Sequence, residues 1–168
     1  GVQKGSVGNV EVCFETGVGK GQLAIGQVFD REQDHLFPYY RDMLTCHSAG
    51  LTAEELILNG ISRDDDVAGG GRHMSNHFAK PEWNIHNVSS CTGNHTLHAV
   101  GLARAMKKYK VPGVAISSQG ESSVSEGYVY EAINGASNEK LPVIFVFTLV
   151  FSRLMRNVFR TLREKVSK

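Results

Sequence analysis

Cysteine and proline are scarce in this chain of 168 residues, which contains three cysteines and four prolines. The cysteines, Cys13, Cys46 and Cys91, are odd in number and far apart in the sequence. This pattern excludes a small scaffold held together by disulfides, and it indicates free thiols in a reducing compartment.

Long apolar runs and a charge of one sign are also missing. The longest apolar run, residues 141–151, is too short to span a bilayer, and we expect no secretory signal segment at the start. The formal net charge of +1 gives the chain no bulk attraction to polyanions. We therefore expect no nucleic-acid partner and no membrane span.

What the chain does contain is typical of a globular domain. Its length suits one domain with a sizeable core, and 41% of its residues are hydrophobic. Charge is uneven, because residues 152–168 hold six of the 18 basic residues and one of the 17 acidic residues. We therefore divide the chain into a domain over 1–151 and a C-terminal segment over 152–168. The segment has the pattern of a basic amphipathic helix, which could dock on the sheet or bind a membrane surface, or it is a divergent or frame-shifted tail.

Residues 113–151 have the pattern of a strand, a polar loop, a helix and a second strand. The strands are predicted over 113–118 and 141–151, and the loop over 119–123. Ser123-x-x-Glu126 fits a capping box that would start the helix near Ser123. A strand, a helix and a strand of these lengths form a βαβ unit, so we predict an α/β fold with a parallel sheet flanked by helices.

The loop of this unit is a candidate anion site, because ligands of such sheets bind beyond the carboxyl ends of the strands. It contains Gly120, Glu121, Ser122 and Ser123. The N-terminus of a helix favours an anion, and a carboxylate fits beside one if a hard cation such as Mg²⁺ lies between them. The alternative is a solvated loop in which Glu121 only faces the helix dipole.

Other elements are predicted with simpler signals. Residues 1–16 suggest one short strand, and the glycine-rich run 17–21 is either a weak phosphate loop or, preferably, the start of a helix over 21–29. Further helices are expected up to Ala49, from the Thr52-x-x-Glu55 capping box to Leu58, and over 94–109. Residues 61–93 lack a regular pattern.

Two more groups of side chains are candidates for chemistry. Tyr40 and Arg41 could bind a phosphate, or they could belong to a packed aromatic turn. His73 with His77, and His95 with His98, have spacings that would suit zinc on helices, but no cysteine pair or matching carboxylate accompanies them.

A series of separated motifs resembles one known family. From about Gly17 to Phe147, the chain is similar to the alpha subunit of the thiamine-diphosphate-dependent 2-oxo acid dehydrogenases, the first components of the pyruvate and branched-chain complexes. The motifs, in order, are YYRD at 39–42, GGGRHMSNHF at 69–78, SS at 89–90, HAVG at 98–101, GESSVSEG at 120–127 and LPVIFVF at 141–147. The resemblance implies a thiamine-diphosphate-binding fold with thiamine diphosphate and Mg²⁺ as cofactors.

The resemblance also implies roles for individual residues. Glu121 matches the carboxylate that binds Mg²⁺, and His77, with Arg72, matches a segment that lines the active-site cavity. The implied catalytic residue is His77, and the implied cofactor-binding residues are Tyr40, Arg41, Ser90, Thr92, Gly120, Glu121, Ser122 and Ser123.

The implied activity is oxidative decarboxylation of a 2-oxo acid, with acyl transfer to lipoamide. The implied partners are a beta subunit and a lipoyl-bearing acyltransferase, in the bacterial cytoplasm or the mitochondrial matrix. Ser122 is a smaller departure from the family pattern, because it stands where the family has the second glycine of its GDG or GEG signature. The larger departure is that Leu149 and Val150 stand where the family has an Asn-Asn pair, one of which is a Mg²⁺ ligand. This departure motivates an alternative, a non-catalytic, truncated remnant or assembly module of the same fold. An unrelated phosphate-binding α/β module is a third hypothesis.

Overall fold

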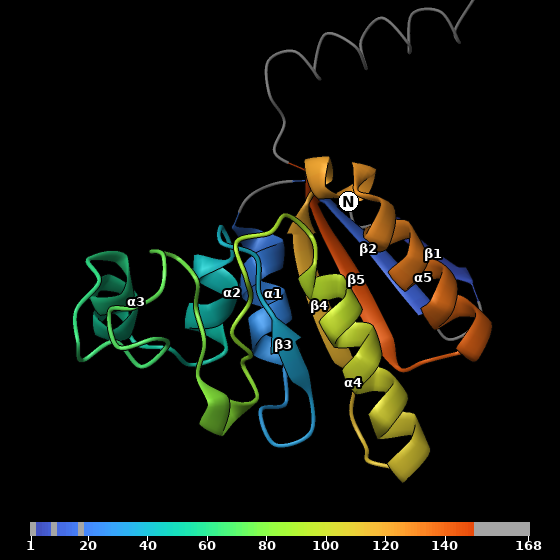
Figure 1. The fold of residues 1–168 in the computed structure, drawn as a ribbon, viewed down its shortest axis with the longest axis horizontal. Helices are drawn as coiled ribbons and strands as arrows, with labels where there is room; N and C mark the ends of the chain where they lie inside the picture. The colour runs from blue at the N-terminus through green and yellow to red at the C-terminus, as the bar shows by residue number, and fades with distance from the viewer. Residues whose placement is uncertain (1–2, 8–9, 17–18, 150–168) are drawn as a thin grey trace, which may run out of the picture.

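The fold is that of a mixed sheet with helices on both faces (Figure 1). The computed structural model describes residues 3–7, 10–16 and 19–149. Its strands and helices, with two 3₁₀ turns named η1 and η2, are, in chain order, β1 Gln3–Val7, β2 Val10–Thr16, α1 Lys20–Val28, β3 His35–Phe37, α2 Met43–Ser48, α3 Ala53–Gly60, η1 Pro81–Trp83, α4 His95–Tyr109, β4 Ala115–Gly120, η2 Glu121–Ser125, α5 Gly127–Glu139 and β5 Val143–Leu149.

The sheet has the strand order β1-β2-β5-β4-β3. Strands β2, β5, β4 and β3 are mutually parallel, and β1 pairs antiparallel with β2 at one edge. The predicted α/β fold with a parallel sheet flanked by helices is confirmed. The carboxyl ends of β3 and β4 therefore lie at the same edge of the sheet, where the segments that follow them can meet.

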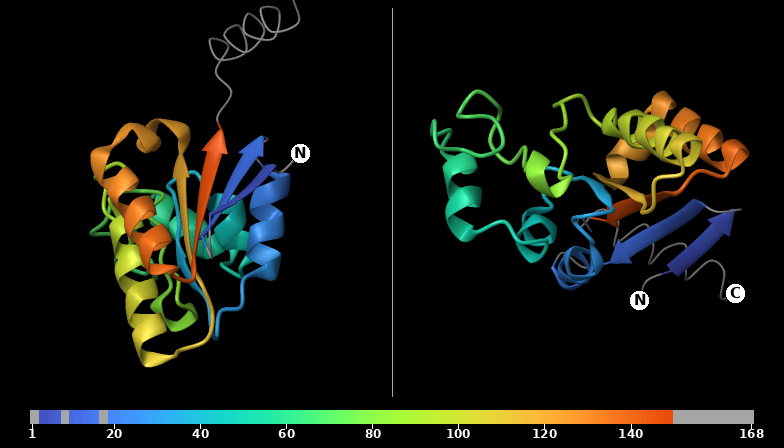
Figure 2. Two further views of the ribbon diagram at one scale, coloured as in Figure 1. Left: turned by 90° about the vertical axis from the view of Figure 1, so that its right-hand side faces the viewer. Right: turned by 90° about the horizontal axis from the view of Figure 1, so that it is seen from below.

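Two hydrophobic clusters hold the helices against the two faces of the sheet. Phe145 and Phe147 point to the face covered by α4 and α5, and they pack with Ala99, Val129 and other buried residues. The alternate residue Val146 points to the opposite face and joins a cluster that contains Phe29 of the α1 region and Cys46 of α2. Figure 2 shows α4 and α5 on one side of the sheet and α1 and α2 on the other. Because successive side chains of β5 point to opposite faces, its apolar residues pack against the helices on both sides of the sheet.

The central βαβ unit is formed by β4, α5 and β5. Every residue of β4 is buried, as expected for a strand covered on both faces. The strand runs over 115–120, two residues later than predicted, so that Gly120 is its last residue and not part of the loop.

The predicted capping box at Ser123 is wrong. Residues Glu121–Ser125 form the 3₁₀ turn η2, and α5 begins only at Gly127 with no side-chain cap. Ser123 is buried inside this turn, and its carbonyl accepts a hydrogen bond from the Glu126 N–H at 3.1 Å. Since Ser123 lies one turn before the helix, its hydroxyl does not cap the first helical N–H groups.

The N-terminal elements also differ from the prediction. Residues 3–7 and 10–16 form two antiparallel strands and not one strand, and β2 pairs in parallel with β5. Helix α1 begins at Lys20, directly after Gly19, whose φ of +127° suits glycine. The interpretation of the glycine-rich run as a helix start is therefore confirmed.

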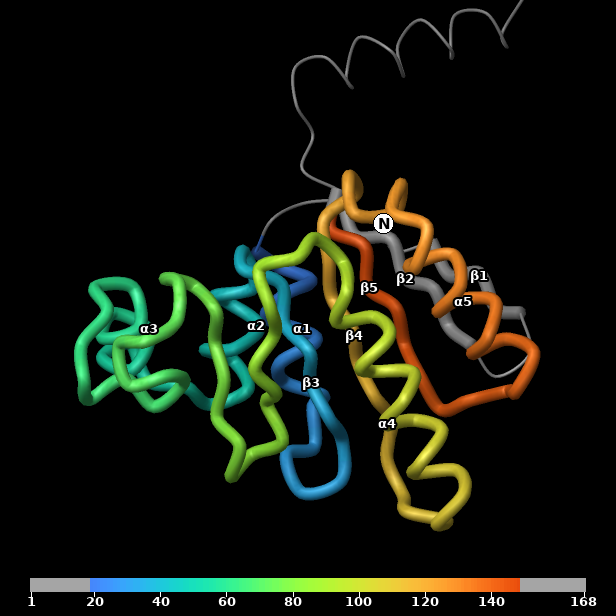
Figure 3. Tube along the Cα trace, viewed as in Figure 1, coloured from blue at the N-terminus to red at the C-terminus, as the bar shows by residue number. Residues whose placement is uncertain are grey.

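Residues 61–93 are irregular apart from η1, as the sequence indicates, and they run along the molecule between α3 and α4 (Figure 3). The capping box of α3 is confirmed, because Thr52 accepts from the Glu55 N–H and Glu55 accepts from the Thr52 N–H. Residues 152–168 lie outside the described residues, so the predictions for that segment stay open. None of the helices in the described part of the chain is both long and apolar enough to cross a membrane.

Candidate functional site

A cavity of about 560 Å³ lies beyond the carboxyl ends of β3 and β4. Three segments that are far apart in the sequence line it. They are the turn after β3, the irregular segment before α4, and η2 after β4. The lining residues are Pro38, Tyr39, Tyr40, Arg41, Met74, Ser75, Asn76, His77, Val88, Ser89, Ser90, Cys91, Thr92, Gly93, His95, Ser122 and Ser123.

The turn after β3 is held by buried polar contacts. The carboxylate of Asp42, which is fully buried, accepts a hydrogen bond from the Tyr39 N–H at 2.9 Å. The amide nitrogen of Gln22, on α1, donates to the same carboxylate at 3.2 Å and to the Arg41 carbonyl at 3.2 Å. Because these contacts fix the backbone, the side chains of Tyr40 and Arg41 are presented to the cavity from a rigid turn.

The guanidinium of Arg41 lies over the ring of Tyr40, 4.4 Å from its centroid, and it donates to the hydroxyl of Tyr39. Tyr39 in turn approaches the end of β4, since its hydroxyl would lie 2.7 Å from a Cβ atom on Gly120. Burial raises the pKa of the Tyr39 phenol, helped by a hydrogen bond with Tyr40, and these two effects outweigh the nearby charge of Arg41, which lowers that pKa. The phenol therefore stays neutral and offers a hydrogen bond, not a charge, beside Arg41.

His77 is 8% exposed and faces Ser90, which lies further along the same irregular segment. Its Nδ1 atom lies 3.2 Å from the Ser75 carbonyl, and its Nε2 atom lies 3.1 Å from the Ser90 hydroxyl. A carbonyl only accepts, so Nδ1 carries a proton and Nε2 of the neutral ring is free to accept one. The Ser90 hydroxyl is also 3.1 Å from the Met74 sulfur, so it can donate either to Nε2 or to the sulfur.

The segment that carries Ser90 and Thr92 is fixed at its far end by α4, α5 and η2. The Tyr128 hydroxyl of α5 donates to the Thr92 carbonyl. Gly93 has a φ of +75°, and a Cβ there would lie 2.9 Å from Val129 and 3.3 Å from the Ser123 side chain. His95 then ties the start of α4 to β4, because its Nε2 lies 2.7 Å from the Ser118 carbonyl. Burial lowers the pKa of His95, so it is a neutral donor there.

The donor set at this edge suits a phosphorylated ligand with a hard cation. Arg41 supplies a fixed cation, and the hydroxyls of Ser122 and Ser123 supply donors. Glu121 follows β4 directly, and Mg²⁺ in phosphate sites is commonly bound by one or two carboxylates together with phosphate oxygens and waters. In addition, Thr148, whose position pairs with Gly120, has a buried hydroxyl with no hydrogen-bond partner among the described residues. These features fit a diphosphate with Mg²⁺, although the described residues include no cluster of three or more metal-ligating side chains.

Most of the predicted site residues meet in this cavity. Tyr40, Arg41, His77, Ser90, Thr92, Ser122 and Ser123 all line it, whereas Gly120 and Glu121 lie beside it at the end of β4. Arg72 does not line the cavity, and its side chain is exposed. Their functional roles stay predictions.

Several residues of the site were not predicted. Tyr39 adjoins a predicted residue, and its place in the aromatic segment is a signal that could have found it. Gln22 lies on another helix, and nothing in its local sequence indicates that it supports the turn. The two histidine pairs whose spacing would suit zinc are not both on helices, because His73 and His77 lie in the irregular segment while His95 and His98 lie on α4.

The fold and the cavity define a class of protein, an α/β protein with a partly polar cavity at the carboxyl ends of parallel strands. Comparison with known proteins gives the family. The family model described as dehydrogenase E1 component matches residues 8–148, and the chain belongs to this family.

Relatives in this family come from several organisms. The chain is 38% identical over 130 residues to the 2-oxoisovalerate dehydrogenase subunit alpha of Bacillus subtilis (strain 168), an alignment that covers 76% of this chain and 39% of the relative. It is 31% identical over 118 residues to the mitochondrial pyruvate dehydrogenase E1 component subunit alpha of Dictyostelium discoideum, with 68% and 30% coverage. The chain thus spans well under half the length of these relatives.

Proposed function

We propose that this chain is the cofactor-binding part of the alpha subunit of a 2-oxo acid dehydrogenase, and that its cavity binds thiamine diphosphate with Mg²⁺. The observation that carries the proposal is the convergence of Tyr40, Arg41, His77, Ser90 and the η2 serines on one cavity. These residues come from three separate segments. Tyr40, Arg41, His77 and Ser90 match the family pattern, whereas Ser122 stands where the family has a glycine.

In this proposal two segments bind the diphosphate, namely η2 and the turn that follows β3. Arg41 pairs with phosphate oxygens, and Tyr40, Ser122 and Ser123 add hydroxyl donors. Glu121 would supply the carboxylate for Mg²⁺, and waters would supply the oxygens that the side chains of Leu149 and Val150 cannot offer. When bound, the cofactor supplies the electron sink for decarboxylation of the 2-oxo acid. His77 holds a proton at Nδ1 and can accept one at Nε2, which lies beside the Ser90 hydroxyl.

The proposal extends to partners, as the family expectation states. A beta subunit completes the active site, and a lipoyl-bearing acyltransferase receives the acyl group. The substrate is a 2-oxo acid, either branched-chain or pyruvate, and the compartment is the bacterial cytoplasm or the mitochondrial matrix.

Arg41 offers a direct test with a matched control. Each of Arg41 and Arg31 lies over an aromatic ring, but only Arg41 lines the cavity. Arg41→Leu should weaken thiamine diphosphate binding at least tenfold, whereas Arg31→Leu should leave it unchanged. Equal affinities for the two variants would contradict the proposed diphosphate site. Preference for simple nucleotides over thiamine diphosphate would favour an unrelated phosphate-binding module.

A second candidate is a non-catalytic module of the same fold, and Leu149 and Val150 favour it because neither side chain can coordinate a metal. The double variant Leu149→Asn, Val150→Asn separates the two candidates. If the wild-type chain with an added beta subunit forms no complex and does not decarboxylate 2-oxo acids, the enzyme proposal fails. Recovery of metal-dependent cofactor binding in the double variant would then show that only the ligand pair was missing.

A further inference from the structure

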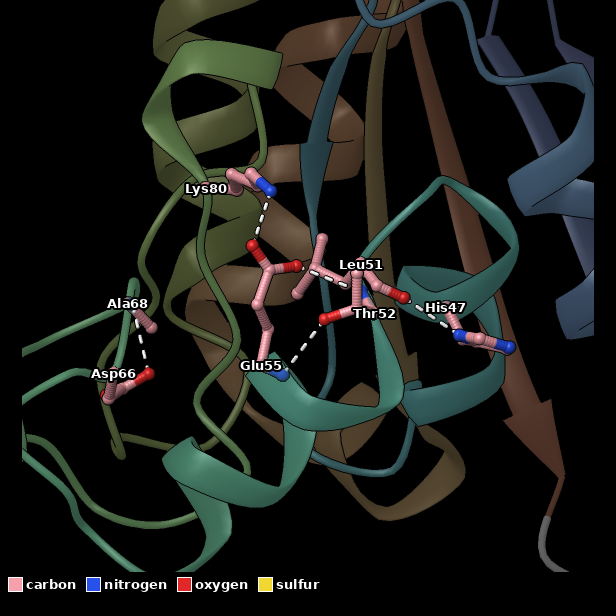
Figure 4. A network of polar contacts seen from close by, with 7 residues as sticks. All are labelled: His47, Leu51, Thr52, Glu55, Asp66, Ala68 and Lys80. Atoms are coloured by element: carbon pink, nitrogen blue, oxygen red, sulfur yellow. Dashed lines mark hydrogen bonds and ion pairs between the residues drawn. The ribbon is translucent and has the colours of Figure 1, made fainter.

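Three consecutive aspartates precede the glycine-rich part of the irregular segment, and the structure treats them differently. Asp64 and Asp65 are exposed, whereas Asp66 is 6% exposed. The Asp66 carboxylate accepts hydrogen bonds from the Ala68 N–H at 3.0 Å and from the Gly69 N–H at 3.1 Å. Figure 4 shows the contact with Ala68 next to the α3 capping box. A buried carboxylate with this set of donors has a specific structural role.

The third donor to Asp66 is Asn59 of α3, which is 2% exposed. Its Nδ2 atom lies 3.1 Å from Asp66 Oδ2 and 3.5 Å from the His77 carbonyl. One amide group thus bridges the Asp66 turn and the backbone of His77, which are 11 positions apart in the sequence. The Asn59 Oδ1 atom is buried without a hydrogen-bond partner among the described residues, so the amide is oriented by its two acceptors alone.

The segment from Asp66 to His77 packs closely against the chain that precedes it. Gly71 has a φ of +70°, and a Cβ there would lie 2.7 Å from the Ser62 carbonyl. The ring of His73 contacts the ring of His77 in a tilted arrangement, with 4.5 Å between the ring centroids. The Asp66 turn therefore contributes to the backbone position of His77 as well as to the local conformation of residues 66–69.

The backbone position of His77 decides the orientation of its ring. With the carbonyl of His77 held by Asn59, Nδ1 meets the Ser75 carbonyl and Nε2 meets Ser90 at the cavity. Neither Asn59 nor Asp66 lines the cavity, so both residues contact His77 or its turn from outside the cavity.

We propose that Asp66 and Asn59 are positioning residues, which hold His77 with its Nδ1 protonated and its Nε2 directed at Ser90 and the cavity. The use of His77 in a reaction rests on the proposed function, but the positioning does not. The effect is therefore measurable in the chain without cofactor, partner or substrate.

The test is ¹⁵N NMR of the His77 imidazole at a pH where the ring is neutral. The wild-type chain should show one protonated Nδ1 signal and one unprotonated Nε2 signal. Asp66→Asn places an N–H group against the donors of Ala68, Gly69 or Asn59, and Asn59→Leu removes both bridging contacts at similar volume. In both variants the two ring nitrogens should move toward averaged shifts, as the tautomers exchange. Asp65→Asn, the exposed neighbour, should keep the wild-type pattern.

Wild-type ring signals in both variants would overturn the proposal. Unfolding of both variants, seen by circular dichroism, would also overturn it, because the pair would then serve the fold and not His77. Failure of the proposed function is distinct, since it would appear as absent cofactor binding or turnover in the wild-type protein with a beta subunit. If turnover is present, both variants should lower kcat more than they raise KM, and Asp65→Asn should change neither.

Discussion

The hydroxyl of Tyr39 would lie 2.7 Å from a Cβ atom on Gly120, so the ring of Tyr39 occupies the space that a side chain at the end of β4 would need. This contact joins the turn after β3 to the loop after β4, which are the two segments that offer Arg41 and Glu121. Any side chain at position 120 must displace Tyr39 and, with it, the guanidinium that donates to the Tyr39 hydroxyl.

Gly120→Ala should therefore destabilise the fold by about 1–3 kcal/mol, as overpacking does, and weaken thiamine diphosphate binding. Urea unfolding and calorimetry measure the two effects. The control is Gly101→Ala in α4, where a Cβ would meet nothing within 4 Å. That substitution should stabilise the protein by roughly 0.5–1 kcal/mol. Equal effects of the two substitutions would contradict the close contact.

The buried carboxylate of Asp42 stabilises the same turn by accepting hydrogen bonds. Asp42→Ala leaves the Tyr39 N–H without its buried acceptor and leaves the Gln22 amide with the Arg41 carbonyl alone. We expect a loss of roughly 2–3 kcal/mol in the free energy of unfolding, together with weaker cofactor binding because Arg41 loses its fixed backbone. Asp65→Ala, on the exposed surface, should stay within about 0.5 kcal/mol of the wild type. A wild-type unfolding curve for Asp42→Ala would show that the turn does not depend on this carboxylate.

Glu55 should make stability depend on acid pH. Burial alone would raise the pKa of Glu55, but hydrogen bonds from Lys80, at 2.5 Å, and from Thr52 outweigh burial and hold it below the usual 4.5. A carboxyl with a lowered folded pKa contributes stability above its unfolded pKa, and this contribution is lost as the pH falls through the folded value. Glu55→Gln should therefore flatten the loss of Tm below about pH 4.5. An unchanged acid limb in Glu55→Gln would contradict this assignment.

His95 should act in a higher pH window. Burial lowers the pKa of His95 below its ordinary value of 6.5, and burial does the same for His35 and His86. The unfolded chain then binds protons more readily, so the free energy of unfolding decreases as the pH falls below about 6.5. His95→Gln keeps an N–H donor for the Ser118 carbonyl and should reduce the slope of Tm against pH between 7.5 and 5, roughly the range in which histidine titrates. The same slope in the variant would mean that His95 does not contribute.

Much of the fold could be predicted from local sequence pattern. The apolar run before Leu149 and the amphipathic pattern of α5 indicate the βαβ unit, because burial on both faces leaves a continuous apolar strand. The Thr52 capping box is predictable because both partners lie within one helical turn. The Ser123 box has the same pattern, but the 3₁₀ turn shifts Ser123 away from the helix end. Tertiary packing of Ser123 against Gly93 overrides the local signal there.

The residues that line the candidate site could be predicted from the sequence, but the residues that hold them in position could not. Arg41, His77 and Ser90 are found through motifs, whereas Gln22 and Asn59 hold them from other helices. Contacts between residues so far apart in the sequence leave no local pattern. The parallel pairing of β2 with β5 is equally non-local, and for that reason the sequence indicates one strand where the structure has β1 and β2.

We propose that this chain holds thiamine diphosphate through Mg²⁺ at Glu121. The most direct measurement is calorimetric titration of thiamine diphosphate with and without Mg²⁺, for the wild-type chain, Glu121→Ala and the control Glu126→Ala. Our account predicts Mg²⁺-dependent binding that is lost in Glu121→Ala and kept in Glu126→Ala. No binding to the wild-type chain at millimolar cofactor, or binding that does not depend on Glu121, would contradict it.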